Sequence, residues 1–180
     1  MHAIFFNTPI EKNWLGHIFS EIYKDKIFAP YVEGKKDLTI VDIGANIGIT
    51  SYYFSQFAKQ VYSLEPAIEH YDLLTKMLQF NEIKNVKAIP KAVWLDNIKL
   101  PFFHNDNRTM YSLHMAVDDK SSPPEEVETI TLDKLFEDEK IEHVDLMKLD
   151  VEGSEVEIIA SEGFAKVASK VDTVIVEQHA

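Results

Sequence analysis

Short apolar, β-branched runs alternate with helix-like segments over most of this 180-residue chain, and this alternation restricts its possible folds most strongly. Three segments between or beside the runs have the apolar spacing of helices: Ile47–Ala58, Pro66–Phe80 and Ser154–Ala160. Chains of this kind form a parallel sheet covered on both faces, with ligands at the carboxyl ends of the strands. The sequence therefore predicts an α/β, doubly wound fold. Its main strands are expected at Leu38–Ile43, Val61–Leu64, Val86–Ile89, Val144–Leu149 and Val171–Val176.

Two regions depart from this alternation. The apolar spacing of Ile10–Ile27 predicts a helix, and we expect residues 1–34 to form an N-terminal helical prelude to a domain of residues 35–180. Between the third and fourth main strands the pattern breaks into short β-like pieces and a polar loop, His104–Ser112. Gly163 is the expected stop of the helix that begins at Ser154. The smaller pieces are expected at Ala92–Leu95, Lys99–Phe103 and Val127–Ile130, with a short helix at Leu132–Phe136.

The charge of the chain is strongly acidic. Thirty Asp and Glu residues against eighteen Lys and Arg give a net charge of −12. This balance argues against nucleic acid and anionic membranes as partners, because both require a basic face. The excess lies between Asp118 and Glu162, where sixteen acids meet four lysines. Both a solvated surface and a pocket that contains carboxylates account for that stretch.

The chain contains no cysteine, which excludes disulfides, zinc–thiolate sites and a thiol nucleophile. Its first residues lack the basic and apolar regions of a signal peptide. No stretch approaches the roughly 18 continuous apolar residues of a membrane-spanning helix. We therefore expect a cytoplasmic protein without a membrane span.

A glycine-containing loop follows the first main strand, in the segment from Asp42 to Gly48. Gly44 permits a tight turn there, and Gly48 permits close packing of the next helix on the sheet. An ordinary strand-to-helix turn has the same pattern, so the loop alone is a weak signal. Glu65 strengthens the functional interpretation, because an acid 21 residues after Gly44 can accept hydrogen bonds from ribose hydroxyls.

Two further residues of this loop distinguish between nucleotide cofactors. Asn46 stands where a dinucleotide-binding loop has its second glycine. Asp42 at the mouth of the strand would repel a pyrophosphate, whereas its carboxylate suits the ammonium and sulfonium groups of S-adenosylmethionine. The loop therefore favours S-adenosylmethionine over a nicotinamide cofactor. The residues expected to bind it are Asp42, Gly44, Asn46, Gly48 and Glu65.

A second group of charged residues surrounds the end of the fourth main strand. Lys148, Asp150 and Glu152 alternate, so they should share one face of the strand. A lysine in a parallel strand requires a partner, which Asp150 or Glu152 can supply. Nearby carboxylates also favour proton abstraction or cation binding. Acids placed to suit the dipole of a helix N-terminus are the alternative, and this alternative accounts well for Glu155 and Glu157.

These motifs, in this order, resemble the FkbM-type S-adenosylmethionine-dependent methyltransferases. The resemblance implies a class I methyltransferase fold, which is Rossmann-like, and methyl transfer to an oxygen of a sugar or other small metabolite. It places Asp42, Gly44 and Gly48 at the methionine end of the cofactor, Glu65 at the ribose and Asp150 at the reacting centre. The segments that carry it are Asp42–Gly48, Glu65–Pro66, Asn85–Val86, Ala92–Val93, Thr131–Asp133, Lys148–Glu155 and Glu177–His179.

The chain departs from the class I pattern at its end. The class I sheet ordinarily continues with a further helix and an antiparallel strand pair, which this chain lacks after Glu177. An exposed sheet edge is prone to pair with another strand. A fragment, a short variant and a protein whose last edge is covered by another chain all fit this end, and the last alternative predicts a homodimer that forms through the exposed edge.

The remaining site residues concern the acceptor and the base. Asp150, Glu152 and His179 are the candidates for the group that removes a proton from the acceptor hydroxyl. Arg108, the one arginine of the chain, is a candidate for binding an acidic acceptor, together with Lys148 and Glu177, although an ordinary loop arginine fits equally well. We assign no residue to a metal site. An NAD-dependent oxidoreductase and a non-catalytic module that binds an adenosine ligand are the alternative functions.

Overall fold

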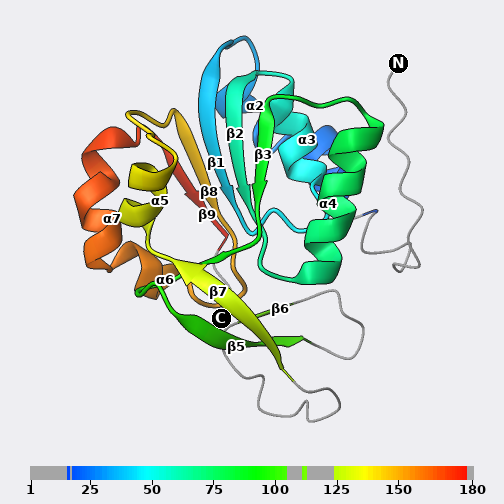
Figure 1. Cartoon of the computed structure of the whole chain (residues 1–180). Helices are drawn as coiled ribbons and strands as arrows, with labels where there is room; N and C mark the ends of the chain where they lie inside the picture. The colour runs from blue at the N-terminus through cyan, green and yellow to red at the C-terminus, as the bar shows by residue number, and fades with distance from the viewer. Residues whose placement is uncertain (1–15, 17, 105–110, 113–123, 178–180) are drawn as a thin grey trace.

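The computed structural model describes residues 16, 18–104, 111–112 and 124–177. Its centre is a five-stranded parallel sheet in the order β3-β2-β1-β8-β9 (Figure 1). The observed sheet confirms the predicted α/β class, and all five main strands lie where apolar runs predicted them. The strands are β1 (Leu38–Ile43), β2 (Ala58–Leu64), β3 (Val86–Ile89), β8 (Leu146–Leu149) and β9 (Val174–Val176).

Helices cover both faces of this sheet, as a doubly wound fold requires (Figure 1). One face carries α3 (Ile49–Ser55) and α4 (Ile68–Phe80). The other face carries α5 (Leu132–Asp138), α6 (Glu155–Ile159) and α7 (Glu162–Val167), which is followed by the short 3₁₀ helix η2 (Ala168–Lys170).

The strands are apolar because both of their faces are buried. In β1, Ile40 packs in the core cluster with Phe54 of α3, whereas Val41 packs in the cluster on the opposite face. Two charged residues interrupt this core at paired positions, because Asp42 of β1 and Lys148 of β8 are register partners in the parallel ladder. Both are buried, so the fold places a charge pair inside the central sheet near its carboxyl end.

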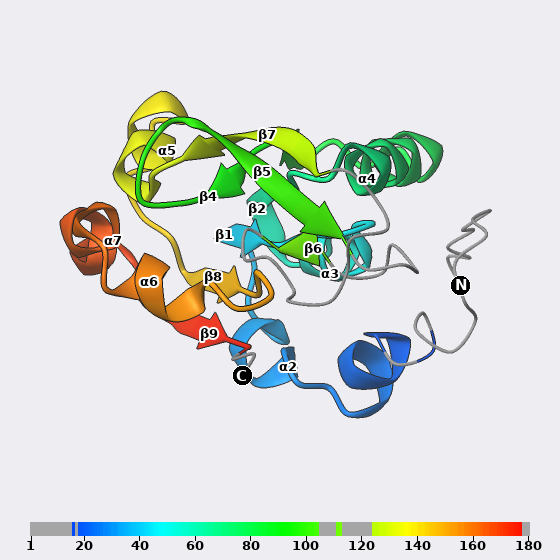
Figure 2. The same cartoon turned by 90° about the horizontal axis from the view of Figure 1, so that it is seen from below.

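A second sheet lies across the carboxyl ends of the central strands (Figures 1 and 2). Its order is β4-β7-β5-β6, with β4 parallel to β7 and β5 antiparallel to both β7 and β6. The short β pieces predicted between the main strands therefore form one sheet, which covers one side of the carboxyl edge of the central sheet. Its strands are β4 (Ala92–Val93), β5 (Lys99–His104), β6 (Tyr111–Ser112) and β7 (Glu125–Ile130).

The predicted N-terminal helix is interrupted before Ile27. The described part forms the π-helix η1 (Ser20–Lys24) and then α2 (Ala29–Val32), so a helix that continues to Ile27 is wrong. Lys26 has a φ of 55°, a left-handed conformation that is incompatible with a continuing helix. The segment nevertheless packs on the domain, because the Phe28 ring meets the Phe54 ring edge-on, with 5.1 Å between the ring centroids.

The region after β8 also differs from its prediction. Gly163 does not stop a helix, since it lies inside α7. That helix starts because the Ser161 hydroxyl, at the N-cap, accepts a hydrogen bond from the Phe164 N–H at 3.0 Å. In the described part of the chain, no helix has the length and apolar character needed to cross a membrane.

Candidate active site

The glycine loop between β1 and α3 is shaped by two close approaches of other elements. Gly44 has a φ of 77°, and a Cβ at this position would overlap the backbone carbonyl oxygen of Asp150. Gly48 has a φ of 92°, and a Cβ there would overlap the side chains of Leu74 and Met77 on α4. The left-handed backbone favours glycine at both positions, and at Gly44 the neighbouring backbone also excludes a side chain, whereas at Gly48 the side-chain ends of Leu74 and Met77 can shift.

Glu65 fixes this loop to the end of β2. Its Oε2 accepts a hydrogen bond from the Asn46 N–H at 2.8 Å, and its Oε1 accepts one from the Ala67 N–H at 2.9 Å. Asn46 adopts a left-handed φ of 52°, and its Oδ1 accepts a hydrogen bond from the Ile47 N–H at 2.7 Å. Glu65 therefore orders the loop and presents a carboxyl group at the same edge of the sheet.

Burial changes the protonation of Glu65. Its removal from water raises the pKa of Glu65 to about 7, against the opposing effect of the Ala67 and Asn46 N–H donors. Because this pKa lies close to neutrality, modest changes in pH alter the charge of a residue in the site.

Lys148 connects the ends of β1 and β8. Its Nζ lies 2.9 Å from Asp150 Oδ2, 3.1 Å from the Gly44 carbonyl oxygen and 3.7 Å from Asp42 Oδ1. Burial disfavours the charged amine, but the carboxylates of Asp150 and Asp42 outweigh it and raise the pKa of Lys148 to about 12. Asp150 is thus a partner of Lys148, as the sequence suggested. The ammonium supports the loop through the Gly44 carbonyl, and its expected contact with an acceptor stays a prediction, since Lys148 also lines the second of the cavities described below.

Asp42 lies behind the loop and not at its surface. Its side chain is completely buried, and its Oδ2 accepts a hydrogen bond from the Ser51 hydroxyl at 2.6 Å. Burial raises the pKa of Asp42, although Lys148 and Ser51 act in the opposite direction. Asp42 lines neither of the two cavities described below. In the structure Asp42 supports the loop through Lys148, which balances the charge that we expected to repel a pyrophosphate, and its expected contact with a cofactor stays a prediction.

The loop after β8 is held by a buried acid. Glu152 and Gly153 have φ values of 57° and 106°, both left-handed. The carboxylate of Glu155 accepts hydrogen bonds from the Val151 N–H at 3.0 Å and the Gly153 N–H at 3.2 Å. Glu155 lies in the first turn of α6, where a helix dipole favours an acid, but it is only 1% exposed, so it also serves to bind the loop backbone. The glycine two residues before it was the available signal for such a turn.

Two cavities flank the glycine loop, and both are lined by Gly44, Asn46, Asp150 and Glu152. The first cavity extends towards the second sheet. The second cavity extends towards the N-terminal segment and the end of β9. Other described residues of the first cavity include Leu64, Glu65, Val93, Phe102 and Ser154, and those of the second include Ile18, Glu21, Phe28, Lys148 and Glu177.

Ser154 is a site residue that the sequence did not reveal. It lines the first cavity and is 1% exposed. Within the described part of the chain, its hydroxyl oxygen has no hydrogen-bond partner. Because buried polar groups are normally paired, this hydroxyl is an unused hydrogen-bonding group beside a cavity.

Of the other predicted site residues, the structure describes Glu177 and Gly48. Glu177 follows β9 and lines the second cavity, together with Asp150 and Glu152. Gly48 lies at the start of α3 and packs against α4, so its role is structural. Arg108 and His179 lie outside the described residues.

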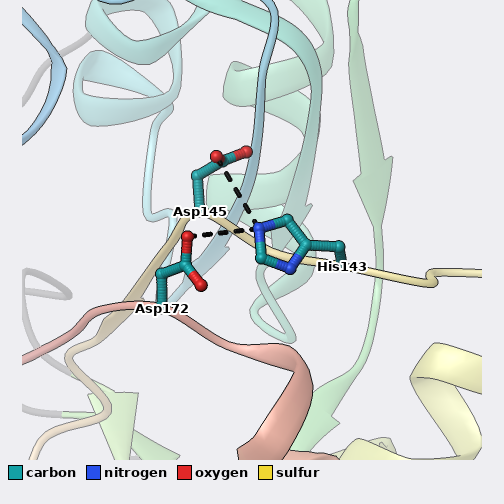
Figure 3. Close-up of side chains that lie close together, drawn as sticks. All are labelled: His143, Asp145 and Asp172. Atoms are coloured by element: carbon teal, nitrogen blue, oxygen red, sulfur yellow. Dashed lines mark ion pairs between the residues drawn. The ribbon is translucent and has the colours of Figure 1, made fainter.

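A different charged group occupies the opposite end of β8 (Figure 3). His143 Nε2 lies 3.2 Å from Asp172 Oδ2 and 3.8 Å from Asp145 Oδ1. The backbone bridge between Val144 and Val171 brings these residues together. In the described ranges, this is the one His and acid group whose atoms lie close enough for a single metal ion. The three residues line neither cavity.

The architecture and the site together define a class of protein. A parallel sheet that runs outwards from its first strand, with a glycine loop after that strand, is the arrangement of Rossmann-like domains. The sequence profile of the methyltransferase FkbM domain matches residues 42–180. The chain therefore belongs to the FkbM methyltransferase family, and the resemblance seen in its motifs is confirmed.

Individual relatives are more distant. The chain is similar to methyltransferase sdnD of Sordaria araneosa, with 27% identity over 79% of this chain and 66% of that protein. Among solved structures, it is similar to a precorrin 8w decarboxylase of Methanobacterium thermoautotrophicum (TM-score 0.49, 15% identity, 84% of this chain and 59% of that one). It is also similar to a SAM-dependent methyltransferase of Aquifex aeolicus (TM-score 0.47, 13% identity, 93% of this chain and 72% of that one). The chain thus spans just under two thirds of the curated relative.

Proposed function

We propose that residues 35–180 form a domain that transfers a methyl group from S-adenosylmethionine to a hydroxyl group of a small-molecule or glycan acceptor in the cytoplasm. Family membership supports methyl transfer. The observation that carries the proposal is the pair of cavities that meet over Gly44 and Asp150 at the carboxyl edge of the sheet. One cavity is available for the cofactor and the other for the acceptor, with shared residues between them.

The first cavity fits the cofactor in its chemistry, because apolar and polar groups both line it, as is usual for small-molecule sites. Leu64 and Phe102 supply apolar surface for a base, and the unpaired Ser154 hydroxyl offers a hydrogen bond. A donor or acceptor on the ligand would satisfy the one buried group that the protein leaves unpaired there.

Specific residues are placed to hold the cofactor. Glu65 would accept hydrogen bonds from the ribose hydroxyls, since it lines the first cavity and each of its oxygens has a further lone pair. The backbone at Gly44 and Asn46 would contact the methionine end, because these residues lie between the two cavities. When bound, S-adenosylmethionine supplies an electrophilic methyl group on a sulfonium.

Asp150 and Glu152 are placed to act on the acceptor, because both line both cavities. A positioned base contributes typically 10²–10⁴-fold to such a reaction by removing the proton of the attacking hydroxyl. Asp150 also forms the ion pair with Lys148, so its loss disturbs the loop as well. Glu152→Gln therefore isolates the base function better than Asp150→Asn does.

Calorimetry with adenosylhomocysteine and NAD, followed by a turnover assay with methyl-labelled cofactor, tests the proposal. We expect binding of adenosylhomocysteine, no binding of NAD and loss of turnover in Glu152→Gln with cofactor affinity nearly intact. Binding of NAD alone would identify an oxidoreductase. Binding of adenosylhomocysteine without turnover on any acceptor would identify a non-catalytic module.

The sheet edge supports a second, smaller proposal. We infer that β9 pairs with a second copy of the chain, because in the described residues β9 is paired on one side only, by β8. Val176 at this edge is 38% exposed. Sedimentation analysis should show a dimer that Val176→Lys weakens, and a wild-type monomer at all concentrations would contradict the inference.

A further inference from the structure

The second cavity differs from the first in the charge of its wall. Its described lining contains four acids, and Lys148 is the one lysine or arginine among the described lining residues. That ammonium is already paired, since it lies 2.9 Å from Asp150 and 3.7 Å from the buried Asp42. The cavity wall is therefore net negative. The acids are Glu21, Asp150, Glu152 and Glu177.

The N-terminal wall of this cavity is held in place by packing. Ile22, the residue after Glu21, is 2% exposed and belongs to the same core cluster as Phe28 and Phe54. The Tyr23 ring meets the Tyr53 ring of α3 edge-on at 5.6 Å. Phe28, just before α2, and Glu177, just after β9, both line this cavity, so the N-terminal wall and the end of β9 face the same space. Glu21 thus lies in a fixed part of the fold.

Much of the rest of the lining is apolar, and Asn46 and Thr50 add polar groups to it. Ile22, Phe28, Ile47 and Ile49 contribute to it, and all four are buried. A cavity with apolar surface and carboxylates favours a ligand with a hydrocarbon or ring body and a positive group, because the carboxylates stabilise a cation and repel an anion.

We propose that the second cavity binds the acceptor and selects one that carries a protonated amine beside the hydroxyl group to be methylated. This inference rests on the proposed methyltransferase function and specifies its substrate class. Acceptors with a carboxylate or phosphate in place of the amine are disfavoured, contrary to the acidic acceptor that Arg108 suggested in the sequence.

The chemistry of the transfer is consistent with such an acceptor. A bond forms between the acceptor oxygen and the methyl carbon while the carbon–sulfur bond breaks, and the sulfur keeps the electron pair of that bond. The hydroxyl proton passes to a carboxylate, Asp150 or Glu152, and then to water. The neighbouring carboxylates keep the amine protonated, so its nitrogen has no lone pair with which to compete for the methyl group.

Three bisubstrate probes test the charge preference directly. Each is adenosylhomocysteine with nitrogen in place of sulfur, and this nitrogen carries a short arm that ends in an ammonium, a hydroxyl or a carboxylate. The arm leaves the cofactor where the methyl group would, so it enters the acceptor cavity. Calorimetry should show that the ammonium probe binds at least tenfold more tightly than the carboxylate probe.

A charge-neutral variant and a matched control locate the effect. Glu21→Gln should reduce the ratio between the ammonium and carboxylate probes at least threefold and leave the hydroxyl probe unchanged. Glu142→Gln removes one exposed charge from the loop before β8, at the other end of the sheet, and should leave the ratio unchanged.

The outcomes separate the two proposals. If adenosylhomocysteine itself does not bind, the proposed function fails. If it binds but no armed probe does, or if the carboxylate probe binds as tightly as the ammonium probe, the acceptor inference is overturned while the methyltransferase proposal stands. The acceptor inference is also overturned if Glu21→Gln does not change the ratio between the affinities of the ammonium and carboxylate probes.

Discussion

The two ends of β8 each carry a basic side chain between two carboxylates, but they differ in burial. At the carboxyl end, Lys148 is 7% exposed and its partner Asp42 is completely buried. At the amino end, the side chain of His143 is 52% exposed and that of Asp172 is 63% exposed (Figure 3). Similar residue types in similar numbers thus form an internal bridge at one end and a surface ion pair at the other.

Burial determines how much each group can contribute. Exposed ion pairs contribute about 0–1 kcal/mol, because water and salt screen them. Removal of one partner of a buried pair costs about 3–5 kcal/mol, because it leaves an uncompensated charge in the interior. The buried group also fixes the Gly44 carbonyl, which belongs to the loop between the two cavities. The number of charged residues therefore says little about either stability or function until their burial is known.

The largest expected effect is that of Lys148→Met. This change leaves the buried Asp42 without its cation, so we expect the free energy of unfolding to fall by about 3–5 kcal/mol in urea titrations. The double variant with Asp42→Asn should recover part of this loss, because it removes the uncompensated charge. If Lys148→Met alone lowers the free energy of unfolding by less than about 1 kcal/mol, water must screen the Asp42 carboxylate.

Glu155→Gln should have the next largest effect. The amide has one oxygen and no charge, so it weakens the hydrogen bonds to Val151 and Gly153 and lowers the free energy of unfolding by about 1.5–3 kcal/mol. Glu157→Gln on the same helix is the control, since that exposed residue should change stability by only a few tenths of a kcal/mol. Equal losses of stability in the two variants would contradict a stabilising role for the hydrogen bonds from Val151 and Gly153 to Glu155.

Glu65 should give stability and binding opposite dependences on pH. Its folded pKa of about 7 lies above the ordinary 4.5, so the folded state binds more protons and stability falls as the pH rises from about 4.5 to 7. Adenosylhomocysteine should bind about tenfold more weakly at pH 6 than at pH 8, because the ribose contact needs the carboxylate. In Glu65→Gln, urea titrations should show a weaker dependence of stability on pH, and calorimetry a weaker dependence of adenosylhomocysteine affinity on pH. If the affinity of this variant depends on pH as in the wild type, a group other than Glu65 causes that dependence.

The smallest expected effect is that of His143→Gln at the exposed end of β8. Its ion pairs with Asp145 and Asp172 are screened, so the free energy of unfolding should change by less than about 0.5 kcal/mol between pH 5 and 8. Affinity for adenosylhomocysteine should not change. A loss as large as that of Lys148→Met would remove the contrast between the two ends.

The strands and the glycine loop could be predicted because their signals are local. A strand buried on both faces is a continuous apolar run, and Val86–Ile89 was predicted with the bounds that the structure has. The loop at Gly44 was visible for the same reason, since a left-handed turn at the end of a strand favours glycine. Lys148 was marked as needing a partner because a charge inside an apolar run is conspicuous.

Features that depend on distant segments could not be predicted in this way. Whether Glu155 faces solvent or turns back on its own loop depends on the left-handed pair at Glu152 and Gly153, which leaves no periodic pattern. The second cavity joins Glu21 to Glu177, residues at opposite ends of the chain. Hydrophobic periodicity shows which face of an element is buried, but not which loop will approach it.

The contact between Gly44 and the Asp150 carbonyl has a consequence for engineering the protein. Because no side chain fits between the two backbones, this point of the site tolerates almost no substitution. The N-terminal wall around Glu21 is different, since its exposed side chain can be exchanged without disturbing either strand. Under the proposed function, variants designed to use a different acceptor should therefore carry substitutions around Glu21, and the glycine loop at Gly44 should stay unchanged.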